Sequence, residues 1–284
     1  MKIISTIQEF QIWRKNILGS IGFVPTMGAL HEGHLSLVAE SNKTCKNTVV
    51  SIYLNPTQFA QGEDLDTYPN RLQDDLNRLS EYKVDCVFTP NNSQMYPEGF
   101  KTNNYSNNLF TLLEGKSRSD FFKGVTTIVA KLFDIVEPTH AFFGEKDFQQ
   151  LCIINKMVKD LNYPVQVVPC PIIREKNGLA MSSRNTYLTE SEHLVSSTIF
   201  KALDSGKKLL KDGKITAKKL RCEITQIINS ETAIRIDYVS VANSDTLEEV
   251  EGELKGGILV SIAVFLGRTR LIDNFTYSLP ELHI

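Results

Sequence analysis

Two histidines lie three residues apart in a loop between a predicted strand and a predicted helix. His31 and His34 belong to the sequence His-Glu-Gly-His, which follows an apolar run at residues 21–24 and precedes apolar residues at helical spacing over residues 35–39. A helix that begins near His31 or Gly33 directs free backbone N–H groups and the positive end of its dipole into this loop. The two imidazoles would then face the same side of the first turn. The pattern favours a site for a phosphate-bearing ligand.

Simpler interpretations of the two histidines stay open. A histidine beside an apolar run is often a hydrogen-bonded structural residue, and a pair three residues apart can also hold zinc. The position at a strand-to-helix turn favours the nucleotide interpretation, because His-x-Gly-His in that place resembles the signature of nucleotidyltransferases. In those enzymes an acceptor attacks the α-phosphate of ATP.

Other polar residues follow predicted strands. Gln58 comes shortly after an apolar run at residues 48–54, and Lys146 comes after the run at residues 140–143. Ligands of parallel sheets bind outside the carboxyl ends of the strands, so both residues are site candidates by position. The alternatives are an ordinary loop amide and a surface lysine.

Composition excludes several classes of protein. The chain of 284 residues carries 31 Lys and Arg against 33 Asp and Glu, which argues against nucleic acid as its main partner. Five scattered cysteines without C-x-x-C spacing are expected to be reduced. The start of the chain lacks the apolar core of a signal peptide, and no apolar run is long enough to span a membrane. We expect a cytoplasmic protein.

The order of the predicted elements indicates a parallel α/β sheet followed by a smaller domain. A short strand and a helix over residues 7–18 come first. Apolar strands at 21–24, 48–54, 84–90, 140–143 and 165–170 then alternate with helices. Pro169 and Pro171 indicate that the last strand lies at a sheet edge or ends there. We place the domain boundary after residue 174. Domain 1–174 would carry the sheet.

The predicted domain 175–284 is of the α+β class. Helices are expected at 189–211 and 216–229, and strands at 236–242 and 257–265. In the first domain, helices are expected at 69–82 and 124–136, whereas the stretch from 91 to 119 is expected to be a loop. Nothing in the second domain suggests a catalytic group of its own, and His193, which lies outside every motif, is expected to be dispensable.

Four motifs in a fixed order resemble those of the pantothenate synthetase (pantoate:β-alanine ligase) family. They are Pro25-Thr-Met-Gly-Ala-Leu-His-Glu-Gly-His34, Asn55-Pro-Thr-Gln-Phe59, Gly144-Glu-Lys-Asp-Phe-Gln-Gln150 and Met181-Ser-Ser-Arg-Asn185. The ending from Gly267 to Asn274 is similar to the C-terminal strand of that family. One segment departs from it, because Arg118-Ser-Asp-Phe-Phe-Lys-Gly124 stands where relatives commonly have Arg-Pro-Gly-His-Phe-Arg-Gly. Lysine at position 123 keeps the charge of arginine but lacks its planar fork.

The resemblance implies a fold, a reaction and partners. The fold would be a Rossmann-like parallel sheet of the class I aminoacyl-tRNA synthetase type with a smaller C-terminal lid domain. ATP and (R)-pantoate would give pantoyl adenylate and pyrophosphate, and β-alanine would then displace AMP. ATP is a co-substrate accompanied by Mg²⁺, the expected assembly is a homodimer, and neither nucleic acid nor a membrane is an expected partner.

The resemblance also assigns residues. It makes His34 the catalytic group, and Gln58 and Gln150 binding residues for pantoate and β-alanine. Asp74, in the first turns of the predicted helix 69–82, either favours the helix start or helps to hold Mg²⁺. The residues implied in ATP binding lie in the first motif, the third motif and the stretch around the fourth: Met27, Gly28, Ala29, Leu30, His31, Glu32, Gly33, His34, Gly144, Glu145, Lys146, Asp147, Ile173, Met181, Ser182, Ser183 and Arg184.

Two other functions remain open. A nucleotidyltransferase that adds AMP to a phosphorylated acceptor would share His-x-Gly-His but would have no use for Gln58 or Gln150. A non-catalytic nucleotide sensor could be built on the same fold. Release of pyrophosphate and AMP in the presence of pantoate and β-alanine separates the ligase from both.

Overall fold

The computed structural model describes residues 1–60, 62–102, 105–118, 120–213 and 215–279. They form two compact units. One unit contains Met1–Glu145 and Gln149–Pro171, and the other contains Lys146–Phe148 and Ile172–Ile284. Most of the motif residues therefore belong to the first unit, whereas Lys146, Asp147 and the Met181–Arg184 segment belong to the second.

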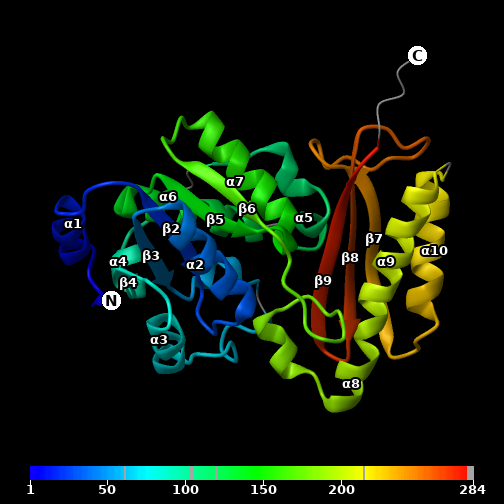
Figure 1. The fold of residues 1–284 in the computed structure, drawn as a ribbon, viewed down its shortest axis with the longest axis horizontal. Coiled ribbons are helices and arrows are strands. Elements are labelled where there is room, and N and C mark those ends of the chain that lie inside the picture. Colours follow the sequence, from blue (N-terminus) through cyan, green and yellow to red (C-terminus); the bar gives the residue numbers. More distant parts are fainter. Residues whose placement is uncertain (61, 103–104, 119, 214, 280–284) are drawn as a thin grey trace. The chain divides into compact units, whose positions relative to one another are not determined.

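The first unit is built on a Rossmann-like parallel sheet (Figure 1). Its six strands have the order β1-β4-β3-β2-β5-β6, and every neighbouring pair is parallel. The strands are β1 Lys2–Ile4, β2 Ile21–Thr26, β3 Asn47–Ile52, β4 Cys86–Phe88, β5 His140–Gly144 and β6 Gln166–Cys170. The predicted alternation of strands and helices is confirmed. Strand β6 lies at an edge of the sheet and ends directly before Pro171, as Pro169 and Pro171 predict.

Helices cover both faces of this sheet, which explains why its strands are apolar on both sides. The helices of the unit are α1 Ile7–Lys15, α2 Glu32–Thr44, α3 Leu72–Ser80, α4 Asn92–Met95, α5 Glu114–Ser117, α6 Phe121–Val136 and α7 Phe148–Asp160. On one face, Val24 and Val50 pack in a core cluster with Leu35 of α2. On the other, Phe23 contacts Phe133 of α6 edge to face.

Several predicted boundaries are wrong. Helix α3 begins at Leu72 rather than Pro69, because its first intrahelical bond runs from Asp75 N to Arg71 O. Helix α6 begins at Phe121, so Gly124 lies inside the helix, where an added Cβ would overlap the backbone oxygen of Thr57. The stretch expected to be a loop from 91 to 119 contains α4, α5 and a 3₁₀ turn at Asn108–Thr111.

The second unit combines an antiparallel sheet with helices packed on one of its faces. Its elements are α8 Glu190–Val195, α9 Ser197–Asp212, α10 Ala217–Asn229, β7 Ile234–Asn243, β8 Gly257–Leu266 and β9 Thr269–Ser278. The strands pair in the order β7-β8-β9. Leu203 of α9 and Ile224 of α10 share a buried cluster with Val260 and Ile262 of β8.

The single helix predicted over residues 189–211 is wrong, because it is divided at Ser196. Thr189 caps α8 in a reciprocal arrangement with Glu192. The Ser196 hydroxyl donates to His193 O over 2.7 Å, and Ile199 N bonds Ser196 O three residues back. A serine that bonds to nearby backbone groups favours such a break. Among the described residues, no helix is both long and apolar enough to cross a membrane.

Candidate active site

The loop between β2 and α2 is held in an uncommon conformation. Gly28 and Ala29 have positive φ angles of 86° and 51°. A left-handed conformation costs a residue with a Cβ about 1–2 kcal/mol, so Ala29 needs compensation. It comes from Asp75 of α3, whose carboxylate accepts hydrogen bonds from Ala29 N at 2.9 Å and Leu30 N at 2.7 Å. Asp75 thus determines the shape of this loop, residues 27–34, which we call the histidine loop.

Asp75 is a residue that the sequence interpretation missed. Its side chain is buried beside Leu76 and Leu79, whereas Asp74 is exposed. Burial raises the pKa of the Asp75 carboxyl, and the hydrogen bonds from Leu30 and Ala29 lower it less than burial raises it. The signal was present, because Asp75 lies on the apolar stripe of an amphipathic helix, where a carboxylate needs a partner.

The two histidines cap helix α2, and this fixes their tautomers. His31 is the N-cap residue; its Nδ1 accepts from Gly33 N at 3.1 Å, and His34 Nδ1 accepts from His31 N at 3.4 Å. Their rings stack with centroids 4.1 Å apart. Because each Nδ1 accepts a hydrogen bond, each neutral ring carries its hydrogen on Nε2. Both Nε2–H groups are donors suited to phosphate oxygens.

The topology brings three predicted loops to one edge of the sheet. Strands β3, β2 and β5 are neighbours and run in the same direction, with Thr26 opposite Ile52 and Phe23 opposite Ala141. The histidine loop, the turn containing Gln58 and the pair Gly144–Glu145 all follow the carboxyl ends of these strands. This is where parallel sheets bind ligands.

Gln58 belongs to a hydrogen-bonded network with Asn55. Asn55 Nδ2 donates to Gly124 O at 3.2 Å and to Gln58 Oε1 at 2.9 Å, while Asn55 Oδ1 accepts from Thr57 and Tyr96 at 3.0 and 2.8 Å. A carbonyl oxygen can only accept, so Gly124 O determines which end of the Asn55 amide faces it. The same Asn55 NH₂ group donates its other hydrogen bond to Gln58 Oε1. The Gln58 amide is therefore oriented with its NH₂ group away from Asn55.

Arg118 supports the same turn from the segment in which this chain departs from the family pattern. Its guanidinium binds both carboxylate oxygens of Glu63 at 2.6 Å and donates to Gln58 O at 3.1 Å. Lys123 forms an exposed ion pair with Asp120 at 2.8 Å. Ser119, within the atypical segment, lies outside the described residues. Arg118 is thus a support for Gln58 that the sequence did not predict.

Gln150 lies in the first turns of α7 and is half-buried. Its neighbour Gln149 is buried and donates to Leu109 O and Leu112 O, both at 2.7 Å. Gln149 therefore holds the chain before α5 in place. Gln150 remains a predicted substrate-binding residue.

The remaining predicted ATP residues belong to the second unit. Lys146 lies 3.8 Å from the Asp147 carboxylate, and Lys146 O accepts from Asn274 Nδ2 at 2.7 Å. The Met181–Arg184 segment follows Ile173, whose backbone oxygen accepts from Met181 N at 2.9 Å. Ser182 Oγ accepts from Arg184 N at 3.3 Å and caps a 3₁₀ turn at Ser183–Tyr187. Hydroxyl and guanidinium groups in sequence suit a polyphosphate.

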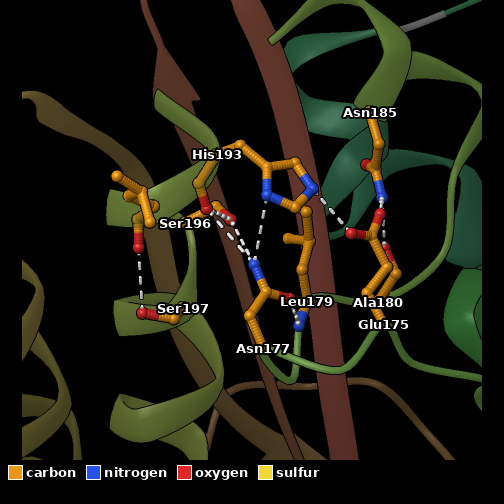
Figure 2. Close-up of polar contacts among 9 residues, drawn as sticks. Glu175, Asn177, Leu179, Ala180, Asn185, His193, Ser196 and Ser197 are labelled. Carbon is orange, nitrogen blue, oxygen red and sulfur yellow. Dashed lines mark hydrogen bonds and ion pairs between the residues drawn. The ribbon is translucent and has the colours of Figure 1, made fainter. Parts of the chain in front are cut away.

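His193, which the sequence analysis expects to be dispensable, has defined hydrogen-bond partners. Its Nε2 lies 2.6 Å from a carboxylate oxygen of Glu175, and Asn177 Nδ2 donates to its backbone oxygen at 3.2 Å (Figure 2). Because Glu175 also binds Asn185, replacing His193 would change a network next to the Met181–Arg184 segment.

The metal prediction rests on Asp74 alone. Among the residues that the structure describes, no group of three or more His, Cys, Asp or Glu residues is placed to hold a metal ion. Mg²⁺ that accompanies a nucleotide usually keeps several waters and takes one or two carboxylates together with the phosphates. The Asp74 side chain is exposed, and its role toward Mg²⁺ stays a prediction.

The parallel sheet and its capped histidine loop define a Rossmann-like protein with a candidate site at the carboxyl edge of the strands. The family model of pantoate-beta-alanine ligase matches residues 2–276, and the chain belongs to that family of ligases. Over 277 residues the chain is 50% identical to a pantothenate synthetase of Acetivibrio thermocellus, and the match covers 96% of this chain and 98% of the relative.

Two solved structures share this fold. A crystal structure of pantothenate synthetase from Thermus thermophilus superposes with a TM-score of 0.91 at 38% identity, covering 97% of this chain and 99% of the other. Pantoate-beta-alanine ligase from Francisella tularensis, crystallised with beta-gamma ATP and beta-alanine, has a TM-score of 0.78 at 33% identity and covers 97% of both chains.

Proposed function

We propose that this protein condenses (R)-pantoate with β-alanine to form pantothenate, at the expense of ATP, with release of AMP and pyrophosphate. The observation that carries the proposal is the capping pair His31 and His34, in which each Nδ1 accepts a backbone hydrogen bond at the start of α2, so that each neutral ring has its N–H at Nε2. The family membership and the beta-gamma ATP and beta-alanine bound to the Francisella tularensis relative support it.

The reaction proceeds in two steps, formation of the adenylate and formation of the amide. A carboxylate oxygen of pantoate attacks the α-phosphorus of ATP, the bond from that phosphorus to the bridging oxygen breaks, and pyrophosphate leaves with the electron pair. The amine of β-alanine then attacks the acyl carbon of pantoyl adenylate, loses a proton, and AMP leaves as the amide forms. His34 is the catalytic group, because its Nε2–H donates to phosphate oxygens as negative charge develops on them.

The other predicted residues bind the substrates. The histidine loop, Met27 to His34, would bind ATP together with Gly144 to Asp147, Ile173 and Met181 to Arg184. Lys146 and Arg184 would neutralise the triphosphate. The outward NH₂ group of Gln58 would donate to an oxygen of pantoate, with Gln150 as a further contact. Asp74 would contribute one carboxylate to Mg²⁺. The positive charge of the ion would offset the negative charge of the phosphates.

Three further assignments belong to this proposal. We assign ATP and pantoate binding to the predicted domain 1–174, and the role of a lid that keeps water from the adenylate to the predicted domain 175–284. The compact units differ from these bounds, because Lys146–Phe148 and residues 172–174 belong to the second unit. The protein acts in the cytoplasm, which the reduced cysteines support. It works as a homodimer, which sedimentation equilibrium tests directly.

Isotope exchange tests the order of events. With Mg²⁺, ATP and pantoate but no β-alanine, we expect labelled pyrophosphate to enter ATP, because the first step is reversible. Omitting pantoate should abolish the exchange, since no other acceptor is present. Exchange that needs β-alanine, or that proceeds with a phosphorylated acceptor and not with pantoate, would favour the nucleotidyltransferase. ATP binding without any exchange would favour the sensor.

A further inference from the structure

The hairpin of residues 174–180 leads directly into the Met181–Arg184 segment and is fastened by its side chains. Arg174 binds both carboxylate oxygens of Asp273 at 2.6 and 2.9 Å, and Arg174 pairs with Ala180 across the hairpin. Asn177 Nδ2 donates to His193 O at 3.2 Å and to Ser196 Oγ at 3.4 Å. The hairpin is thus tied both to β9 and to the junction of α8 and α9.

Glu175 connects the hairpin to Asn185, the residue that follows Arg184. One carboxylate oxygen accepts from Asn185 Nδ2 at 2.6 Å, and the other lies 2.6 Å from His193 Nε2 (Figure 2). Both contacts are short, as hydrogen bonds to an ionised carboxylate are. Glu175 therefore bridges helix α8 and the end of the Met181–Arg184 segment.

The surrounding acceptors allow only one orientation of the Asn185 amide, the one in which its NH₂ group faces Glu175. Asn185 Nδ2 also donates to Ala180 O at 3.1 Å, whereas the buried Asn185 Oδ1 has no hydrogen-bond partner among the described residues. A flipped amide would place Oδ1 against the Ala180 carbonyl and the Glu175 carboxylate, which are both acceptors. The unpaired oxygen is tolerated because two acceptors require the NH₂ group in this position. Asn185 is only 8% exposed.

We propose that Glu175 is a positioning residue for the triphosphate of ATP. It acts through Asn185 by fixing where the Met181–Arg184 segment ends, and His193 orients its carboxylate. This inference rests on the proposed function, because that function assigns Ser182, Ser183 and Arg184 to ATP. It predicts that Glu175 affects binding of ATP and leaves binding of pantoate unchanged, since Gln58 and Gln150 do not belong to this network.

The test compares Glu175→Ala and Glu175→Gln with the matched control Glu190→Gln, an exposed carboxylate of α8. Glu175→Ala should weaken ATP binding, measured by calorimetry without pantoate, about ten-fold or more, as expected for the loss of one charge-assisted hydrogen bond. Its KM for pantoate in pyrophosphate exchange should stay within about two-fold of wild type. Glu175→Gln should restore most of the ATP affinity, because glutamine still accepts from Asn185. Glu190→Gln should match wild type.

Asn185→Asp supplies an independent variant, because its carboxylate would repel Glu175 and Ala180 O. We expect its ATP affinity to fall by the same order as in Glu175→Ala. Wild-type ATP affinity in either variant, an equal loss of pantoate affinity, or a Glu175→Gln protein as impaired as Glu175→Ala would overturn the proposal. Failure of the proposed function looks different: the wild-type enzyme would bind ATP, with affinity still dependent on Glu175, but show no pantoate-dependent exchange.

Discussion

Asn55 fixes the orientation of the Gln58 amide, and so determines that Gln58 offers a donor. The 2.9 Å contact from Asn55 Nδ2 to Gln58 Oε1 depends on Gly124 O, which holds the Asn55 NH₂ group on the same side. A substrate that binds Gln58 must then present an acceptor, such as a carboxylate or hydroxyl oxygen.

Asn55→Asp tests this relationship. The new carboxylate would repel both Gly124 O and Gln58 Oε1, and the Gln58 amide would turn its NH₂ group inward. In pyrophosphate exchange we expect the KM for pantoate to rise about ten-fold or more, with the KM for ATP within about two-fold of wild type. Asn77→Asp, at an exposed position of α3, is the matched control. A rise in the KM for ATP alone would contradict the assignment of this turn to pantoate.

Removing the Asp75 carboxylate should destabilise the histidine loop. Asp75→Ala leaves the N–H groups of Ala29 and Leu30 without an acceptor, and we expect the free energy of unfolding to fall by about 2–4 kcal/mol. Asp74→Ala at the neighbouring exposed position should change stability by less than about 0.5 kcal/mol. Denaturant titration measures both. If Asp74 binds Mg²⁺, its replacement should instead raise the Mg²⁺ concentration needed for exchange.

The Asp75 carboxyl should also give stability a dependence on pH. Its pKa in the folded protein is raised above the ordinary value of 3.8, chiefly by burial. The folded state then holds this proton more tightly than the unfolded state. Its contribution is fully present below pH 3.8 and is lost as the pH rises through the folded pKa. The free energy of unfolding of wild type relative to Asp75→Asn should therefore fall across this range. A difference that rises with pH would show that the folded pKa is lowered.

His34→Ala should lower the rate of pyrophosphate exchange by roughly 10²–10⁴ without preventing folding, as expected for a positioned donor. His193 is unsuitable as the control because it binds Glu175. His140, at the opposite end of β5 from the site, is a better choice, and His140→Gln should keep nearly full exchange. Equal losses in the two variants, or an unfolded His34→Ala protein, would support a purely structural role for the imidazole.

The cysteines should differ in reactivity. Burial raises the pKa of Cys170 to about 11 and that of Cys86 to about 12, and it also raises the pKa of Cys45. Thiolates react and thiols do not, so these three side chains should resist a disulfide reagent at about pH 8 until the protein unfolds. Cys222 is exposed on α10 and should react first. Modification of Cys45, Cys86 or Cys170 before Cys222 in the folded protein would contradict this order.

Local sequence patterns predicted the elements that depend on local interactions. The strand, loop and helix around His31 follow from apolar periodicity and capping, and the edge position of β6 follows from Pro169 and Pro171. The pairings that orient the site were not predictable in this way. Asp75 meets Leu30 from 45 residues away, and Asn55 meets Gly124 from 69 residues away. Hydrogen bonds between distant segments leave no periodic signal in the sequence.

The break at Ser196 and the His193 contact were missed for a related reason. A helical period continues across residues 189–211, so apolar spacing alone predicts one helix. The division depends on a serine hydroxyl and on the 174–180 hairpin, whose Asn177 reaches both His193 O and Ser196 Oγ. Tertiary contacts here override the local pattern.

The bond between Asp75 and the histidine loop means that the loop is not a transferable module. Residues 21–44 contain the strand, the histidines and the helix, but the acceptor that compensates for the left-handed Ala29 comes from α3. A peptide or a graft of residues 21–44 onto another parallel sheet would keep the signature and lose its shape. Transfer to a new scaffold requires a buried carboxylate placed opposite the loop.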